Sequence, residues 1–166
     1  DNYAHSGGYR AGQDSKAISI DENGNVVGFI MNDKCAAGTG RFLEMIARTL
    51  EISLETMAKE GLTFQEDLNI TSVCSVFAES EVITLIANNK ERSDIIHGIN
   101  KAIASKTVSL VDRVGRKERF MMTGGVAKNH GVVSAIENIL KTTLYIPGDP
   151  QLCGALGAAL SGIERL

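Results

Sequence analysis

The sequence has little of what marks several large classes of protein. It has no apolar run near the roughly 18 residues of a membrane-spanning helix. The formal net charge of -3 over 166 residues excludes the basic surface typical of nucleic-acid-binding proteins. Three cysteines form no dense disulfide framework, and the three histidines have no partner at metal-ligand spacing. With 43% hydrophobic residues, the chain is predicted to be one globular domain in a reducing, cytoplasmic setting.

What is present is an alternation of short strands and helices. Ala17–Ile20 and Val26–Met31 flank the turn dipeptide Asn23-Gly24, which predicts a β-hairpin. Apolar residues at helical spacing predict helices over 42–50, over 54–59 after a Ser53 cap, beyond Cys74, from a Ser93 cap to 114, over 132–140 and over 154–160. Further short strands are expected at 70–73, at 119–122 as a buried strand, and at 143–146. This order predicts the α/β class.

Two cysteines share a local context. Cys35 precedes a glycine-rich turn into a helix, and Cys74 leads directly into the next one. The positive end of a helix dipole lowers the pKa of a thiol, which suits an anionic metal–sulfur centre. Because two thiolates do not complete four ligands, such a site requires a second copy of the chain in a symmetric dimer. The alternative is that both are buried small hydrophobic residues, as is expected for Cys153.

Three segments could contact a nucleotide. Thr123-Gly124-Gly125 follows a strand and opens a helix, an arrangement in which phosphate or ribose can lie against the backbone. The loop 36–40 has the same character, and Gly12–Lys16 groups an amide, a carboxylate, a hydroxyl and an amine that could orient water and a magnesium-bound phosphate. No Walker A motif is present. Tight connections and a solvated polar turn are the alternatives.

Taken together, five segments resemble one family. They are Gly12–Lys16, Asn32–Glu44, Cys74–Glu81, Thr123–Asn129 and Gln151–Ala159. In this order they strongly resemble the activators of 2-hydroxyacyl-CoA dehydratases, ATPases of the BadF/BadG/BcrA/BcrD type. The ATPase subunits of benzoyl-CoA reductase are relatives with the same motifs.

The resemblance implies an actin-like, ribonuclease H-like ATPase lobe in which helices flank a sheet. It also implies a homodimer with one 4Fe-4S cluster between subunits, ligated by Cys35 and Cys74. Such proteins use ATP and Mg²⁺ to drive one electron from a ferredoxin or flavodoxin into the dehydratase. The full-length protein is therefore expected to be an ATP-hydrolysing electron-transfer activator. Alternatives are a benzoyl-CoA reductase ATPase subunit, a metal-free sugar-kinase-like lobe and an assembly module without catalysis.

Residue by residue, the resemblance assigns catalytic roles to Gln13 and Asp14. It assigns cofactor binding to Lys16, Gly38, Thr39, Gly40, Gly124, Gly125, Asn129, Gly154 and Ala155. The family's first phosphate turn, Asp-x-Gly-Ser/Thr, has no counterpart, and Tyr9 stands where the second phosphate segment has aspartate. We therefore expect an irregular start over 1–11, a C-terminal lobe over 12–166 and no N-terminal lobe.

Overall fold

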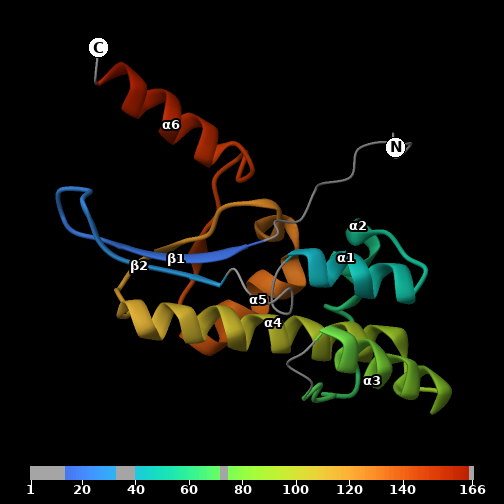
Figure 1. Cartoon of the computed structure of the whole chain (residues 1–166). Helices are drawn as coiled ribbons and strands as arrows, with labels where there is room; N and C mark the ends of the chain where they lie inside the picture. Colours follow the sequence, from blue (N-terminus) through green and yellow to red (C-terminus); the bar gives the residue numbers. More distant parts are fainter. Residues whose placement is uncertain (1–13, 33–39, 72–74, 165–166) are drawn as a thin grey trace.

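The structure is a computed structural model that describes residues 14–32, 40–71 and 75–164 (Figure 1). In chain order the elements are β1 (Ser15–Ile20), β2 (Val26–Asn32), α1 (Gly40–Thr49), α2 (Leu54–Glu60), α3 (Ser75–Ala87), α4 (Arg92–Val114), β3 (Phe120–Met121), the 3₁₀ helix η1 (Gly125–Lys128), α5 (His130–Leu140), β4 (Leu144–Tyr145) and α6 (Cys153–Ile163). None of the helices in these ranges is long and apolar enough to cross a membrane.

The predicted hairpin is confirmed. Strands β1 and β2 pair antiparallel, with Ala17 opposite Ile30. The Asp21 carboxylate accepts hydrogen bonds from the backbone N–H groups of Asn23 and Asn25, at 2.9 and 2.8 Å. Gly24 has φ +84°, a conformation that glycine adopts without steric cost. Local side-chain hydrogen bonds and one glycine thus close the turn without help from the rest of the fold.

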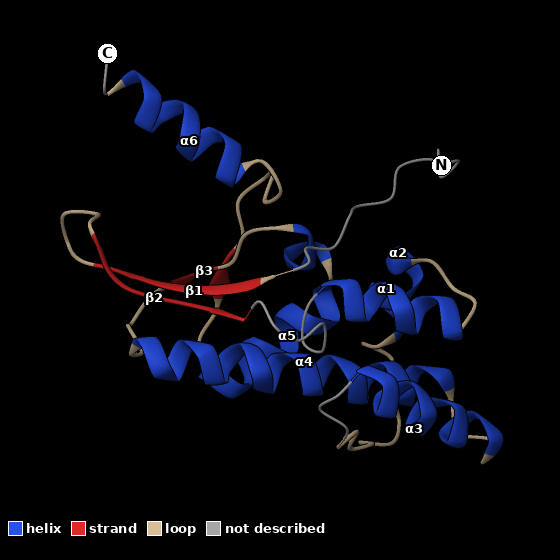
Figure 2. Cartoon of the chain, in the orientation of Figure 1, coloured by secondary structure: helices blue, strands red, loops and turns tan. Residues whose placement is uncertain are grey.

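Helix α4 is the centre of the core, and the other elements are arranged around it (Figure 2). Its residues Ile95, Ile96 and Ile99 are fully buried, which is the apolar face that the sequence predicts. Helices α2, α3 and α5 pack against α4, and the hairpin covers its C-terminal half. There the hairpin backbone comes close, since a Cβ at Gly28 would lie 3.3 Å from the Val114 Cγ1.

The second sheet is a parallel pair joined by a helix. Strands β3 and β4 place Phe120 beside Leu144, and η1 and α5 form the crossover that a parallel pair requires. The expectation of a fully buried strand at 119–122 is wrong in part. Only two residues form the strand, and Met121 is 62% exposed because successive side chains point to opposite faces. The predicted strand at 143–146 is confirmed in its two central residues.

Helix ends are where the structure departs most from sequence expectation. The Ser53 cap of α2 is confirmed, since its hydroxyl accepts from the Thr56 N–H at 3.1 Å. The predicted Ser93 cap is wrong: α4 begins at Arg92, and Glu91 occupies the cap position with extended backbone. At the other predicted strand, Ile70 and Thr71 are loop residues, where the Thr71 N–H donates to the Glu81 carboxylate at 3.3 Å. The rest of that segment lies outside the described residues.

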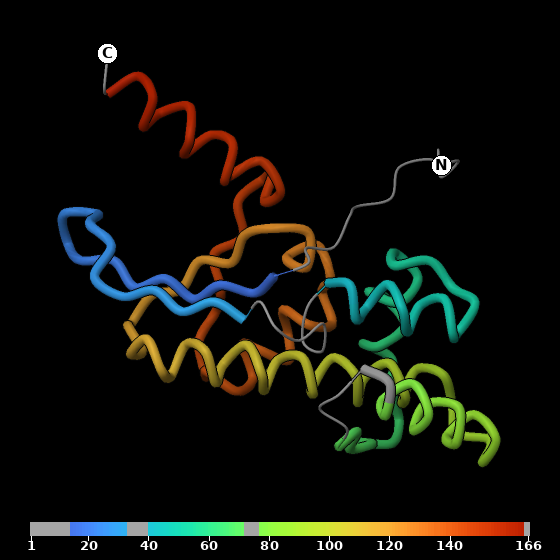
Figure 3. Tube along the Cα trace, viewed as in Figure 1, coloured from blue at the N-terminus to red at the C-terminus, as the bar shows by residue number. Residues whose placement is uncertain are grey.

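Helix α6 extends away from the other elements. Figure 3 traces the chain from β4 out along this helix to the C-terminus. No residue of α6 is buried, and Cys153 is only half-buried, its thiol donating to the Asp149 carbonyl at 3.6 Å. The helix is as predicted but longer, whereas the expected packing of Cys153 does not occur among the residues that the structure describes.

Candidate functional site

The two predicted cluster ligands, Cys35 and Cys74, lie outside the described residues. The helices that follow them, α1 and α3, pack against each other. The Thr49 hydroxyl of α1 donates to the Glu79 carboxylate of α3 at 3.0 Å, and Phe42 and Val82 share one core. The segments with the cysteines thus lead into two neighbouring helices. Among the described residues, no group of three or more acidic, histidine or cysteine side chains could hold a metal ion.

The predicted nucleotide turn is held by a distant segment. Gly124 has φ +88°, and its N–H donates to the Pro150 carbonyl at 2.7 Å. A Cβ at Gly124, Gly148 or Gly154 would meet nothing within 4 Å among the described residues. Two predicted cofactor-binding segments, 123–129 and 151–159, are therefore brought together by the Gly124 hydrogen bond, with open backbone on each. Open glycine backbone is the type of surface that nucleotides approach closely.

The turn does not enter helix α5 directly, as the sequence predicts it should. The 3₁₀ helix η1 intervenes and includes Gly125, which is buried. Asn129 then ends η1 and caps α5, its Oδ1 accepting from the Val132 N–H at 3.1 Å. The Asn129 side chain is fully buried, so its contact in this structure is with the helix end. It fixes where the glycine turn stands relative to α5.

Sequence reasoning missed the neighbour of this cap. Asn100 is fully buried in the apolar face of α4, and neither of its amide atoms has a hydrogen-bond partner among the described residues. A Cβ at Gly131 would lie 2.2 Å from its Nδ2 and 3.3 Å from Asn129 Oδ1. The signal was available, because a lone amide in a row of isoleucines is a buried polar group that needs an explanation.

The second phosphate segment is described only from Asp14 onward, so Gln13 is not placed. Asp14 and Lys16 form an ion pair at 3.3 Å, with side chains 39% and 44% exposed. An exposed pair of this kind contributes little to stability, which leaves both groups accessible to a ligand. Of the other predicted residues, Gly40 is buried at the start of α1, Ala155 is exposed in the first turn of α6, and Gly38 and Thr39 lie outside the described residues.

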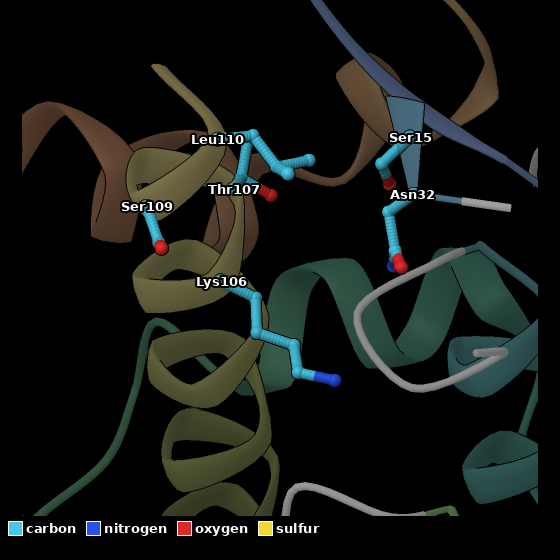
Figure 4. Close-up of a pocket in the computed structure, with 6 residues that line it drawn as sticks. All are labelled: Ser15, Asn32, Lys106, Thr107, Ser109 and Leu110. Carbon is cyan, nitrogen blue, oxygen red and sulfur yellow. The ribbon is translucent and has the colours of Figure 1, made fainter. Parts of the chain in front are cut away.

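A shallow cavity of about 160 Å³ lies elsewhere, between the hairpin and α4. Figure 4 shows the strand-end residues Ser15 and Asn32 on one side and the α4 residues Lys106 and Thr107 on the other. It does not include the glycine turn. The predicted nucleotide residues form an open backbone surface, whereas this cavity adjoins the strand ends that lead into the segments with Gln13 and Cys35.

Residues 9–162 match the model of the BadF/BadG/BcrA/BcrD ATPase family. The chain belongs to this family. It is 50% identical over 153 residues to the activator of lactoyl-CoA dehydratase of Anaerotignum propionicum, covering 92% of this chain and 59% of the relative. One of the benzoyl-CoA reductase subunits of Thauera aromatica, another family relative, is 31% identical over 156 residues, 90% of this chain and 55% of its own.

Solved structures agree on the fold. The activator of the 2-hydroxyisocaproyl-CoA dehydratase from Clostridium difficile with bound ADPNP superposes with a TM-score of 0.89 at 42% identity, covering 95% of this chain and 60% of that one. The expected α/β, actin-like ATPase fold is thereby confirmed. The chain spans about three fifths of the length of these relatives.

Proposed function

We propose that residues 12–166, after an irregular start over 1–11, form the C-terminal lobe of an ATP-dependent one-electron transfer protein that activates a 2-hydroxyacyl-CoA dehydratase. The 50% identity to a dehydratase activator, over 92% of this chain, is the observation that best supports this proposal. The first lobe of the ATPase would have to come from polypeptide outside these residues. Its natural setting would be the reducing cytoplasm.

The nucleotide half of the proposal rests on the Gly124–Pro150 junction. ATP or ADP would lie along the open backbone at Gly124 and Gly154, with Ala155 beside it. Asp14, with Gln13 before it, would orient water and the magnesium-bound phosphates, and Lys16 would offset phosphate charge once its pairing with Asp14 opens. A related structure contains the ATP analogue ADPNP, which supports nucleotide binding at this fold.

The redox half of the proposal rests on the cysteines. Cys35 and Cys74 would supply two thiolate ligands, and the same residues of a second copy of the chain would supply the other two. A bound 4Fe-4S cluster would supply one-electron chemistry between a ferredoxin or flavodoxin and the dehydratase. The packing of α1 against α3 supports a shared site, because both cysteine segments lead into that helix pair.

The competing functions fit less well. A benzoyl-CoA reductase ATPase subunit is a family relative, but the reductase polypeptide from Thauera aromatica is only 31% identical to this chain, against 50% for the lactoyl-CoA dehydratase activator. A metal-free sugar-kinase-like lobe would leave Cys35 and Cys74 without a role. Neither alternative explains both cysteines and the closer relative together.

Calorimetric titration with ADP tests the nucleotide half. Gly124→Ala should weaken ADP binding by about tenfold or more, because a methyl group enters the open backbone at a positive φ. Gly115→Ala is the matched control, since Gly115 has φ +97° and equally open space but lies at the far end of α4. Equal loss of affinity in both variants, or none in either, would contradict the assignment of this turn.

Anaerobic purification with iron and sulfide analysis tests the redox half. We expect about four irons and four sulfides per dimer and a broad visible absorption band. Cys35→Ala and Cys74→Ala should each abolish iron retention, whereas Cys153→Ala should keep it. A colourless dimer that the Cys35→Ala substitution leaves unchanged would refute the cluster while leaving nucleotide binding intact.

A further inference from the structure

Helix α6 is built like a buried helix, but none of the described residues covers it. Its exposed large side chains recur at helical spacing, with exposed fractions of 61, 61, 54 and 68% for Leu152, Leu156, Leu160 and Ile163. Its other sides carry alanine and glycine, and no charged residue occurs between Asp149 and Glu164. A helix that is apolar all round belongs inside a protein core.

The outer face of the hairpin shows the same anomaly. The residues of β1 and β2 that face α4 are small, as with Ala17 and Ser19. The large ones point outward, with Ile18, Phe29 and Val27 at 54, 53 and 59% exposed. A sheet with one solvated face has polar side chains there, whereas a sheet that is apolar on both faces is covered on both. In Figure 1 this outer face and α6 lie on the side of the hairpin away from α4.

We infer that α6 and the outer face of β1 and β2 form one docking surface for a second folded lobe. Its occupant is the polypeptide that the relatives carry in the roughly two fifths of their length that this chain does not match. Both parts of the surface are uncharged apart from Lys16, so the facing surface of that lobe is apolar too. This inference rests on the proposed function, in which a first lobe completes the ATPase.

Two other occupants fit the helix less well. A membrane is unsuitable because α6 has 11 residues and is about 16 Å long at 1.5 Å per residue, roughly half the hydrocarbon thickness. A second copy of this chain would cover α6 along one stripe through a two-fold axis. That leaves the alanine and glycine faces exposed, whereas insertion into the core of a lobe covers every side.

The small residues of α6 suit this insertion. Cβ atoms at Gly154, Gly157 and Gly162 would meet nothing within 4 Å in the described part of this chain. A partner helix could therefore approach the α6 backbone closely, at or below the lower end of the usual 8–10 Å interaxial distance. The stripe from Leu152 to Ile163 would then fill the space on the opposite side. Because α6 begins three residues after Pro150, docking here would also set the Gly124–Pro150 junction beside the second lobe.

Hydrogen exchange of the α6 amides tests the inference. We would measure it in this chain alone and in a chimera, in which this chain replaces the 153 matched residues of the Anaerotignum propionicum activator. Alone, an 11-residue helix with no packing is marginal, so its amides should exchange almost freely. In the chimera, burial should slow their exchange by about 100-fold or more. The readout needs neither nucleotide nor iron.

One substitution and its control separate docking from general damage. Leu160→Asp, at a side chain 54% exposed, should abolish the added protection in the chimera. Ile83→Asp, on α3 with a side chain 53% exposed, should leave it intact. An inactive chimera with protected α6 would refute the proposed function and keep the docking surface.

Three outcomes would overturn the docking inference. The first is α6 amides that exchange equally fast in the chimera and alone. The second is a chimera that does not fold, because a lobe from a 50% identical relative would then not fit this surface. The third is protection of α6 in the isolated chain together with a sedimenting dimer that Leu160→Asp dissociates, which would assign the face to a second copy.

Discussion

The contact between Gly131 and Asn100 gives a sharp test of the packing behind the nucleotide turn. Gly131 is the second residue of α5, directly after the turn and its Asn129 cap. Gly131→Ala would place a methyl carbon 2.2 Å from Asn100 Nδ2 and 3.1 Å from its Cγ. Asn100 is fully buried in α4, so its amide cannot swing into solvent.

The magnitude follows from that geometry. The amide nitrogen would have to retreat by about 1.2 Å to reach an ordinary contact of 3.4 Å, which requires α4 and α5 to separate. Overpacking of this kind costs about 1–3 kcal/mol, while alanine in a helix recovers up to about 1 kcal/mol over glycine. We expect a net loss of about 1–2 kcal/mol in the free energy of unfolding. For a domain of this length, that lowers the melting temperature by about 2–8 °C.

The decisive experiment is a double-mutant cycle. Asn100→Ala alone should change stability by less than about 1 kcal/mol, because the cavity it leaves is offset by removal of two unpaired amide atoms. Combined with Gly131→Ala it removes the clash, so urea unfolding should show a coupling of at least about 1 kcal/mol. Gly157→Ala, at an open helix position, should not destabilise. Additive effects of Asn100→Ala and Gly131→Ala would refute the reasoning.

Two further predictions concern the ends of α2 and α4. Arg92 binds Glu60 with two hydrogen bonds of 2.7 Å and lowers the pKa of that carboxyl. The pair therefore stabilises the fold above the ordinary glutamate pKa and is lost as the pH falls through the lower, folded value. Urea unfolding of Arg92→Gln should show a loss of about 0.5–1 kcal/mol at pH 7 that vanishes by about pH 3, and an equal loss at both pH values would contradict this. Buried Asp94 accepts from the Gln65 and Glu66 N–H groups at 2.7 and 3.1 Å. Asp94→Ala should cost about 2–3 kcal/mol and speed exchange of those two amides, and unchanged exchange would argue against this role.

Local patterns predicted the elements well because their causes are local. The Asn23-Gly24 turn and the Ser53 cap depend on hydrogen bonds within a few residues. The Ser93 cap was wrong because a serine two residues further on competes with backbone geometry that Glu91 already satisfies. The buried strand at 119–122 was wrong because burial depends on what covers each face, which no local pattern states.

The candidate site divides in the same way. The glycine turn was recognisable from the residues, but its hydrogen bond from Gly124 to Pro150 joins positions 26 residues apart. Asn100 could not be connected with Asn129 from sequence, because the two meet only where α4 crosses α5. Cys35, Cys74, Gln13, Gly38 and Thr39 remain predictions of the family resemblance.

By itself, the sequence determined the α/β class, the hairpin, most helices and the family, since these depend on periodicity, turn chemistry and ordered motifs. Only the tertiary structure decided which apolar side chains are covered. It buries the isoleucines of α4 completely and leaves those of β1 and the leucines of α6 exposed. The physical reason is that hydrophobicity states how strongly a side chain favours burial, whereas the arrangement of neighbouring elements decides whether anything within the chain can cover it.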